Sequence, residues 1–252
     1  MPVLRLAAAA LACLLLAPAA ASAKVPDGWL GVIADGPLTR QGAALDGEWD
    51  LMKASGAGSV RTAFYWPLAQ PTEGAPPDFS GYDAVVLQAA RRGLPVLPIV
   101  TGTPGWAGRK RGNETSPPRS GLHAGFLRAL AARYGPAGSL WAEHPEIAAR
   151  PIRAWQIWNE PNLTRYWSRQ PFATSYVALL REAHRALRAA DPKARVILAG
   201  LPNESWTALR RVYKAGGRRF FDAVALHPYT GKPRNVVRLP ELARRDARSS
   251  FT

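Results

Sequence analysis

The chain has 252 residues, with 33 Lys and Arg against 18 Asp and Glu, a formal net charge of +15 and a single cysteine. This length fits one large domain or a slightly short α/β barrel better than two independent domains. The charge favours polyanionic partners, but the basic residues are spread along the chain on expected helix faces, which is typical of a solvated basic surface. Because Cys13 falls within the leader described next, the rest of the chain can form no disulfide and no thiolate metal site.

The first residues, 1–23, have the pattern of a secretory signal. A basic start at Arg5 precedes an apolar run and then Ala21-Ser22-Ala23, a small-x-small cleavage site. The run is too short to span a bilayer, a retained anchor being the alternative, and no later segment is apolar for long enough. We therefore expect a signal peptide at 1–23, one secreted or cell-wall-associated domain at 24–252, and no integral membrane segment after cleavage.

Short apolar strands then alternate with helix-patterned segments, as in parallel βα units. Three apolar stripes predict helices around 82–89, 122–134 and 176–187. Runs such as 196–199 are apolar on both faces, which indicates parallel strands with side chains inside a barrel and helices outside. The expected strands are six, at 29–34, 59–66, 95–101, 152–158, 195–200 and 221–226.

Pro and Gly residues follow several of these strands, so the loops at their carboxyl ends are elaborate. In a barrel such loops build the active site. The polar loop 108–120 is either a mobile lid or a disordered excursion. It contains the only tight basic cluster, Arg109-Lys110-Arg111, with no recognition helix or aromatic ladder around it, so we do not expect nucleic acid as a partner.

The segment 155–162 places an acid and an amide side by side where the fourth strand ends. A glycosidase needs one Asp or Glu to protonate the departing glycosidic oxygen, and donors that grip the sugar hydroxyls. Glu160 and Asn159 are the candidates for these two roles.

Four motifs in chain order resemble the clan A glycoside hydrolases, with the closest likeness to families 39 and 5. They are 60–66, 102–107, 157–162 and 221–229, and they extend across nearly the whole chain after the leader. The resemblance implies an α/β fold, a (β/α)8 TIM barrel that is incomplete, with about six of its eight βα units present. It also implies retaining hydrolysis of a β-linked oligo- or polysaccharide, without a cofactor or metal.

The resemblance also implies a role for each matching residue. Glu160 is the expected general acid and then general base, and Asn159 the donor to the substrate's 2-hydroxyl. His227 and Tyr229 would orient substrate and hold the nucleophile, while Arg61 would neutralise part of its charge. Candidates for stacking on sugar rings are Trp66, Trp106 and Trp167.

Several of these residues have a purely structural alternative. His227 can be a core histidine, Arg61 can pair with any buried acid, and any single loop tryptophan can be core. Trp155 and Trp158 are expected to pack the barrel rather than to touch sugar. His123, His144 and His184 lack metal-ligand spacing and are interpreted as structural.

The nucleophile implied by the resemblance belongs at the end of a seventh strand, which the sequence does not contain. Glu204 and Asp35 follow expected strands, but neither matches the nucleophile position. Because the residues that support a nucleophile are present, we expect a truncated hydrolase that lacks it and is unstable through its open sheet edges. The alternatives are a non-catalytic carbohydrate-binding barrel and a basic protein that binds an anionic cell-wall polymer.

Overall fold

The computed structural model describes residues 28–34 and 45–249. The expected signal peptide, Cys13 and Asp35 lie outside these residues.

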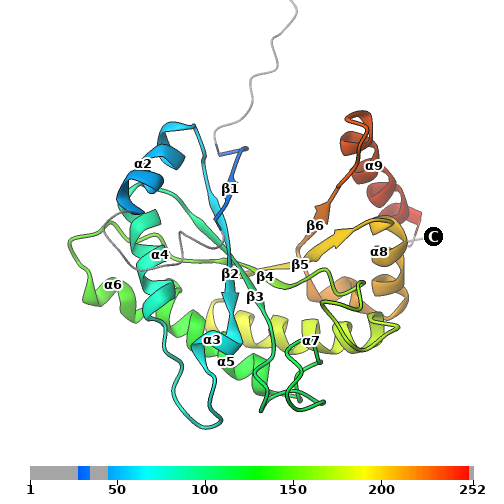
Figure 1. The fold of residues 1–252 in the computed structure, drawn as a ribbon, viewed down its shortest axis with the longest axis horizontal. Helices are drawn as coiled ribbons and strands as arrows, with labels where there is room; N and C mark the ends of the chain where they lie inside the picture. Colours follow the sequence, from blue (N-terminus) through cyan, green and yellow to red (C-terminus); the bar gives the residue numbers. More distant parts are fainter. Residues whose placement is uncertain (1–27, 35–44, 250–252) are drawn as a thin grey trace, which may run out of the picture.

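The described residues form one curled sheet of six parallel strands in sequence order (Figure 1). The strands are β1 (Val32–Ile33), β2 (Val60–Tyr65), β3 (Val96–Thr101), β4 (Ala154–Asn159), β5 (Arg195–Pro202) and β6 (Ala223–His227). All six expected strands are confirmed, with shifted ends. Within the described residues β1 pairs with β2 alone and β6 with β5 alone, so the sheet is a half-barrel, an incomplete (β/α)8 barrel.

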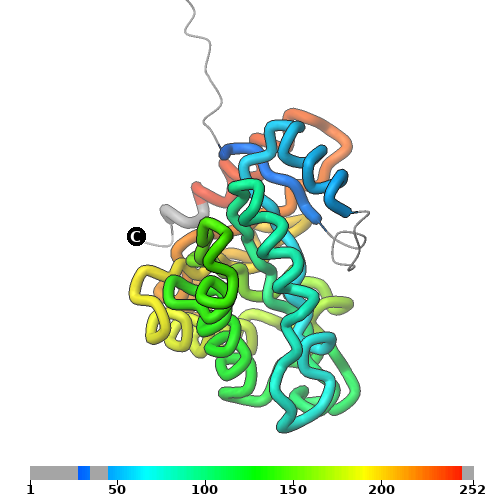
Figure 2. Tube along the Cα trace, turned by 90° about the vertical axis from the view of Figure 1, so that its left-hand side faces the viewer, coloured from blue at the N-terminus to red at the C-terminus, as the bar shows by residue number. Residues whose placement is uncertain are grey.

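Helices pack along the outer side of this sheet (Figures 1 and 2), and Figure 1 shows the sheet curling around an opening between β1 and β6. The three expected helices correspond to α4, α5 and α7, whereas α2 and α8 were not predicted individually. No helix in the described ranges has the length and apolar composition of a membrane span. The helices are α2 (Asp46–Ala54), α3 (Trp66–Ala69), α4 (Ser80–Arg91), α5 (Leu122–Tyr134), α6 (Ser139–Glu143), α7 (Ala173–Ala190), α8 (Ser205–Lys214), the 3-10 turn η3 (Gly217–Phe220) and α9 (Arg234–Ser249).

The core lies between the outer face of the sheet and the helices. Strand β5 buries Val196 and Leu198, and α7 buries the stripe that predicted it, including Leu180 and Leu187. Each fully buried Leu or Val contributes about 1.5–3 kcal/mol relative to exposure. Trp155 and Trp158 are both buried and pack the barrel as expected, but Trp158 also lines the cavity described below.

A gap in the ladder between β4 and β5 is bridged by a side chain. Ile157 pairs with Leu198 and Asn159 with Gly200, but the step between them is skipped where Trp158 adopts φ 71°. The hydroxyl of Tyr176 on α7 fills the gap: it donates to the carbonyl of Ile157 at 2.7 Å and accepts from the amide of Ala199 at 2.8 Å. Two buried backbone groups are thereby satisfied by one hydroxyl.

We predict that Tyr176→Phe destabilises the fold. It removes the shared partner of two buried backbone groups, each costing about 1–3 kcal/mol when unsatisfied. Chemical denaturation of both proteins measures the loss. Tyr213→Phe is the matched control, because the Tyr213 hydroxyl makes no hydrogen bond to a described residue, and an equal loss in both variants would contradict this account.

His123 is a fully buried histidine with no hydrogen-bond partner on either ring nitrogen. Its ring lies edge-on to Trp66, with centroids 5.7 Å apart, and is tilted 6.5 Å from Trp158. Burial lowers the pKa of His123 to about 3, because the apolar surroundings disfavour the imidazolium. The structural interpretation of His123 fits this position.

We predict that His123 makes the fold acid-sensitive. The unfolded chain protonates His123 below about pH 6.5 and the folded chain only near pH 3, so stability is full above pH 6.5 and falls with decreasing pH, by up to about 1.4 kcal/mol per unit. His123→Leu removes this proton uptake. Its free energy of unfolding, measured by denaturant titration, should drop by roughly 2–3 kcal/mol less than that of the wild type between about pH 7 and pH 4. If the free energies of unfolding of the two proteins change equally with pH, the imidazole has no such role.

Candidate active site

The candidate site begins where β4 ends in strained backbone. Trp158 and Glu160 have positive φ angles of 71° and 47°, which non-glycine residues rarely adopt. The amide of Glu160 donates to the carbonyl of Gly200 at 3.0 Å, which holds the turn against β5. Such strain persists only where surrounding contacts impose it, and it is common at functional sites.

The carboxyl group of Glu160 is buried and its two oxygens differ. The side chain of Glu160 is 5% exposed. Oε1 lies 2.7 Å from Nδ1 of His227, whereas Oε2 has no hydrogen-bond partner among the described residues. The guanidinium of Arg165 lies near this second oxygen, with Nη2 3.7 Å from Oε2. One oxygen is thus held by a hydrogen bond, and the other is not.

Arg61 contacts two side chains beside Glu160, those of His227 and Asn159. Its Nη2 lies 3.4 Å from Nε2 of His227 and donates to Oδ1 of Asn159 at 3.2 Å, while Nε donates to Oε1 of Gln156 at 3.0 Å. Because a guanidinium only donates, Nε2 of His227 must accept. The proton of neutral His227 therefore lies on Nδ1 and is donated to Glu160.

The same contact orients the amide of Asn159. Its Oδ1 is occupied by Arg61, so the NH2 group remains available as a donor at the cavity wall. This is the donor orientation expected for a residue that grips a hydroxyl.

These residues open onto a cavity of about 580 Å³. Its floor includes the inward-facing Ile33, Ala63 and Ile99, and its rim is polar and aromatic. Tyr229 is 71% exposed at this rim, and its ring lies 5.5 Å from that of His227. The structure thus brings together Arg61, Asn159, Glu160, His227 and Tyr229 from β2, β4 and the end of β6.

Two residues at the cavity were missed by the sequence analysis. The hydroxyl of Tyr65, the last residue of β2, donates to Oε2 of Glu114 in the loop after β3, at 2.6 Å. Burial, followed by the hydrogen bond to Glu114, raises the pKa of Tyr65. Gly102, at φ 80°, makes room for the ring, since a Cβ there would lie 2.4 Å from it. The available signal was the position of Tyr65 at a strand's carboxyl end.

Arg165 and Tyr166 also line the cavity and were not singled out from the sequence. The guanidinium of Arg165 lies over the ring of Tyr166, 4.6 Å from its centroid. Both belong to the loop that follows Glu160. The motif that directed the sequence analysis to this site, 157–162, ends before them.

The prediction that three tryptophans stack on sugar is not supported by their positions. Trp66 and Trp167 are 0% exposed, so the prediction is wrong for them in this arrangement. Trp66 packs on Phe126, and Trp167 meets Trp158 edge-on. Trp106 is partly exposed but lies outside the cavity, with Nε1 donating to the carbonyl of Gln70. The tryptophan that does line the cavity is the buried Trp158, beside Tyr65, Tyr166 and Tyr229.

The remaining acids and histidines lie elsewhere. Glu204 is exposed, precedes α8 and does not line the cavity. His144 pairs with Glu146 and His184 packs on Phe220. In the part of the chain that the structure describes, no group of three His, Cys, Asp or Glu side chains converges to hold a metal ion.

The loop 108–120 has a defined conformation, unlike a disordered excursion, and its movement as a lid stays a prediction. Gly108 pairs with Pro118 in an antiparallel bridge, and Oγ1 of Thr103 donates to the carbonyl of Ser116 at 2.8 Å. The amide of Ser168 donates to the carbonyl of Thr115 at 2.9 Å. In this conformation Glu114 and Thr115 of the loop form a wall of the cavity.

Comparison with known proteins supports the fold. No family model and no curated sequence matches the chain. Among solved structures, a family 39 β-xylosidase from Caulobacter crescentus superposes with a TM-score of 0.60 at 22% identity, covering 84% of this chain and 49% of that one. The family 39 enzyme from Xanthomonas axonopodis pv. citri gives 0.66 at 18% identity, covering 87% and 48%. The family 53 catalytic domain of Ignisphaera aggregans gives 0.56 at 21%, covering 87% and 66%.

These neighbours are glycoside hydrolases with TIM-barrel domains, so the fold inferred from the motifs is confirmed. The chain spans about half the length of the family 39 structures that it matches. At these identities the similarity concerns the fold, and the chemistry rests on the geometry above.

We predict that Gly200→Ala disrupts the site. A Cβ at residue 200 would lie 2.1 Å from Nε2 of His227, so the ring must leave its place between Arg61 and Glu160. We expect a loss of about 1–3 kcal/mol from overpacking. Gly47→Ala on α2 is the control, because its Cβ meets nothing within 4 Å and should stabilise by about 0.4–1 kcal/mol. Denaturant unfolding measures both, and an unchanged Gly200→Ala variant would contradict the packing described.

Proposed function

We propose that this chain carries the acid/base centre of a glycoside hydrolase that acts on a β-linked oligo- or polysaccharide. The single observation that carries the proposal is the asymmetric carboxyl group of Glu160. Its Oε1 is held by His227, and its buried Oε2 has no hydrogen-bond donor among the described residues, the guanidinium of Arg165 lying 3.7 Å away. An unsatisfied buried oxygen is costly, by about 1–3 kcal/mol, and protonation allows it to donate to an incoming oxygen instead.

In this proposal Oε2 protonates the departing glycosidic oxygen and later takes a proton from water. His227 keeps the carboxyl plane fixed through Oε1, and Arg61 keeps His227 in the required tautomer. The amide of Asn159 grips a sugar hydroxyl beside the scissile bond, and the exposed ring of Tyr229 meets the face of a sugar.

Glycoside hydrolysis requires a second carboxylate across the bond. The sequence analysis expects the retaining nucleophile to be missing from this chain. Among the described residues that line the cavity, the other acid is Glu114, which is exposed and anchored by Tyr65. We assign the acid role to Glu160 and regard Glu114 as the residue to test for the second role.

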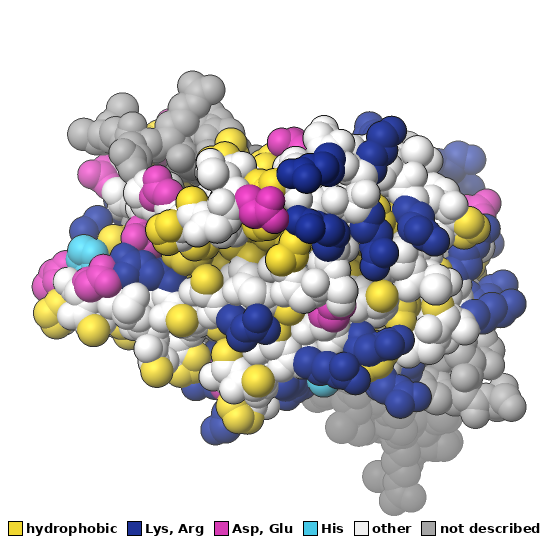
Figure 3. Space-filling view, turned by 90° about the horizontal axis from the view of Figure 1, so that it is seen from below, with side chains coloured by type: hydrophobic (Ala, Val, Ile, Leu, Met, Phe, Trp, Pro, Cys, Tyr) yellow, Lys and Arg dark blue, Asp and Glu magenta, His cyan; other side chains and the backbone are white. Residues whose placement is uncertain are grey.

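The surface of the protein bears on its partners and location. Figure 3 shows a face on which Lys and Arg side chains outnumber acidic ones, in line with the net charge of +15. We propose secretion through the leader at 1–23 and an affinity for anionic cell-wall polymers, with no role for nucleic acid. Such affinity would weaken steeply as salt concentration rises.

The second candidate is a carbohydrate-binding barrel without turnover. It is favoured by the origin of Glu114 in a loop rather than at a strand end, since a loop acid need not be placed for catalysis. The two functions differ in one observable: both bind glycans at the cavity, but only the hydrolase releases product.

We predict that Glu160→Gln abolishes hydrolysis while retaining glycan binding. The amide keeps the volume of the acid but cannot donate the proton, and loss of general acid catalysis costs about 10²–10⁴ in rate. Release of the aryl group from a panel of aryl β-glycosides measures turnover, and calorimetry with the unhydrolysed oligosaccharides measures binding.

Two further variants locate the second carboxylate. Glu114→Gln should lower the rate comparably if Glu114 fills that role, whereas Glu204→Gln, a glutamate outside the cavity, should change nothing. Binding without turnover in the wild type would favour the non-catalytic barrel. A wild type that neither binds nor cleaves any glycan in the panel would refute the proposal.

A further inference from the structure

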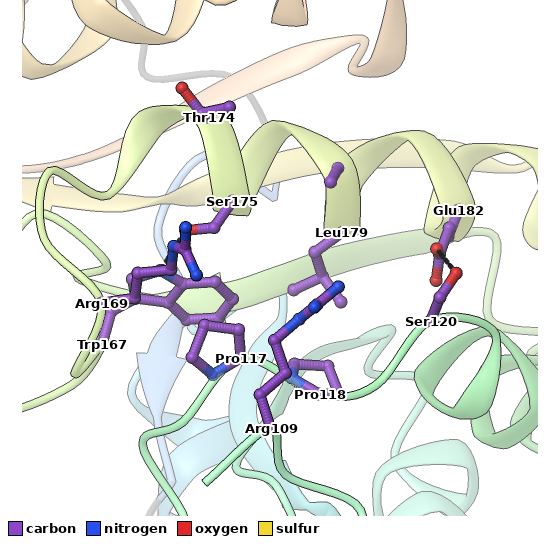
Figure 4. A pocket seen from close by; sticks show the side chains of 11 residues that line it. Arg109, Pro117, Pro118, Ser120, Trp167, Arg169, Thr174, Ser175, Leu179 and Glu182 are labelled. Atoms are coloured by element: carbon purple, nitrogen blue, oxygen red, sulfur yellow. Dashed lines mark hydrogen bonds between the residues drawn. The ribbon is translucent and has the colours of Figure 1, made fainter.

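A second pocket of about 220 Å³ lies between the loop 108–120 and the first turns of α7 (Figure 4). Arg109, Pro117 and Pro118 come from the loop, Ser175 and Leu179 from α7. Trp167 and Arg169 lie just before the helix. Figure 4 shows Arg169 beside Ser175 and Arg109 extending from the loop toward Leu179. The basic cluster noted in the sequence thus contributes one residue to a pocket.

This pocket shares a wall with the candidate active site. Thr115 and Tyr166 line the site cavity, while their near neighbours Pro117 and Trp167 line the second pocket. The amide of Ser168 joins the two segments by donating to the carbonyl of Thr115 at 2.9 Å. A glycan in the cavity therefore has a second pocket directly behind one wall.

The two ends of the pocket differ in charge. Within the described residues the guanidinium groups of Arg109 and Arg169 have neither an ion pair nor a hydrogen bond. The acid at the other end, Glu182, is already occupied: it accepts from Oγ of Ser120 and from the amide of Gly121. Positive charge therefore dominates at the arginine end, beside the hydroxyl of Thr174. The hydroxyl of Ser175 is already engaged, since it donates to the carbonyl of Phe172 and accepts from Nε1 of Trp167.

A guanidinium presents its N–H groups in a planar fork that matches a carboxylate or a sulfate, so a pair of unpaired arginines is suited to such a group. The amino end of α7 adds a favourable partial charge within its first turn. The volume is below the roughly 300–1,000 Å³ of sites for larger ligands, so it accommodates one charged unit and not an extended polyanion.

We propose that this pocket binds one acidic sugar unit through its carboxylate or sulfate group. The pocket itself requires only Arg109 and Arg169, so its binding of an acidic sugar is independent of the proposed function.

The test is calorimetric titration of the full chain with glucuronic acid, glucose 6-sulfate and glucose at low and high salt. We expect at least one of the two acidic sugars to bind about tenfold more tightly than glucose, which is the size of one charge-assisted hydrogen bond, with an affinity that falls as salt rises. The better of the two acidic sugars identifies the charged group as carboxylate or sulfate. Equal binding of all three sugars would overturn the proposal.

The variants separate the pocket from the general basic surface. Arg109→Gln and Arg169→Gln should each weaken binding of the acidic sugar about tenfold. Lys110→Gln is the matched control, because Lys110 is exposed in the same loop and lines neither pocket. Ala178→Phe fills the pocket from an exposed position on α7 without changing charge, and should also abolish binding. A loss in Lys110→Gln equal to that in Arg109→Gln, or full binding in Ala178→Phe, would refute the pocket.

Glu160→Gln distinguishes this inference from the proposed function. That variant should keep its affinity for the acidic sugar, because Glu160 does not line the second pocket. If the wild type binds the acidic sugar but hydrolyses no glycan, the pocket is supported and the proposed hydrolase activity is refuted. If acidic and neutral glycans are hydrolysed at equal rates, the pocket takes no part in selecting the hydrolysed glycan.

Discussion

The skipped step between β4 and β5 at Trp158 determines how the rest of the site is built. A regular ladder would continue β4 with alternating side chains. The positive φ of Trp158 interrupts it, and the hydroxyl of Tyr176 supplies the two hydrogen bonds that the interruption would otherwise cost. The chain can then turn so that Asn159 and Glu160 follow one another into the cavity. A helix on the outside of the sheet thereby maintains a reactive geometry on the inside.

Beside that turn, a short chain of hydrogen-bonded side chains leads from Arg61 to the acid. Arg61 contacts His227, and His227 contacts Glu160, so the charge of the guanidinium influences the acid through an imidazole rather than directly. On this side the buried carboxyl group accepts a hydrogen bond from the imidazole, while the guanidinium of Arg165 lies 3.7 Å from its other oxygen. That second oxygen has no hydrogen-bond donor among the described residues, and in the proposed function it is the atom that exchanges the proton.

The fold was accessible from the sequence because its signals are local. Two-sided apolar runs such as Val196–Ala199 predict buried parallel strands, and the stripe on α7 predicts its buried face. Glu160 was found because it follows the end of an apolar strand, whereas Arg61 and His227 were found through the resemblance of the motifs that contain them. Tyr65 and Glu114 were missed because their contact joins β2 to a loop 49 positions away. Trp66 and Trp167 were misplaced because an indole suits a core as well as a sugar face, and sequence spacing does not separate the two.

The loop 108–120 then determines how the two pockets relate. It lies between them, with Glu114 and Thr115 on the side of the cavity and Arg109 and Pro117 on the other. An acid therefore faces the cavity while an arginine of the same loop faces the second pocket. Because the segment after Glu160 is arranged likewise, with Tyr166 on one side and Trp167 on the other, a rearrangement of either segment would alter both pockets together.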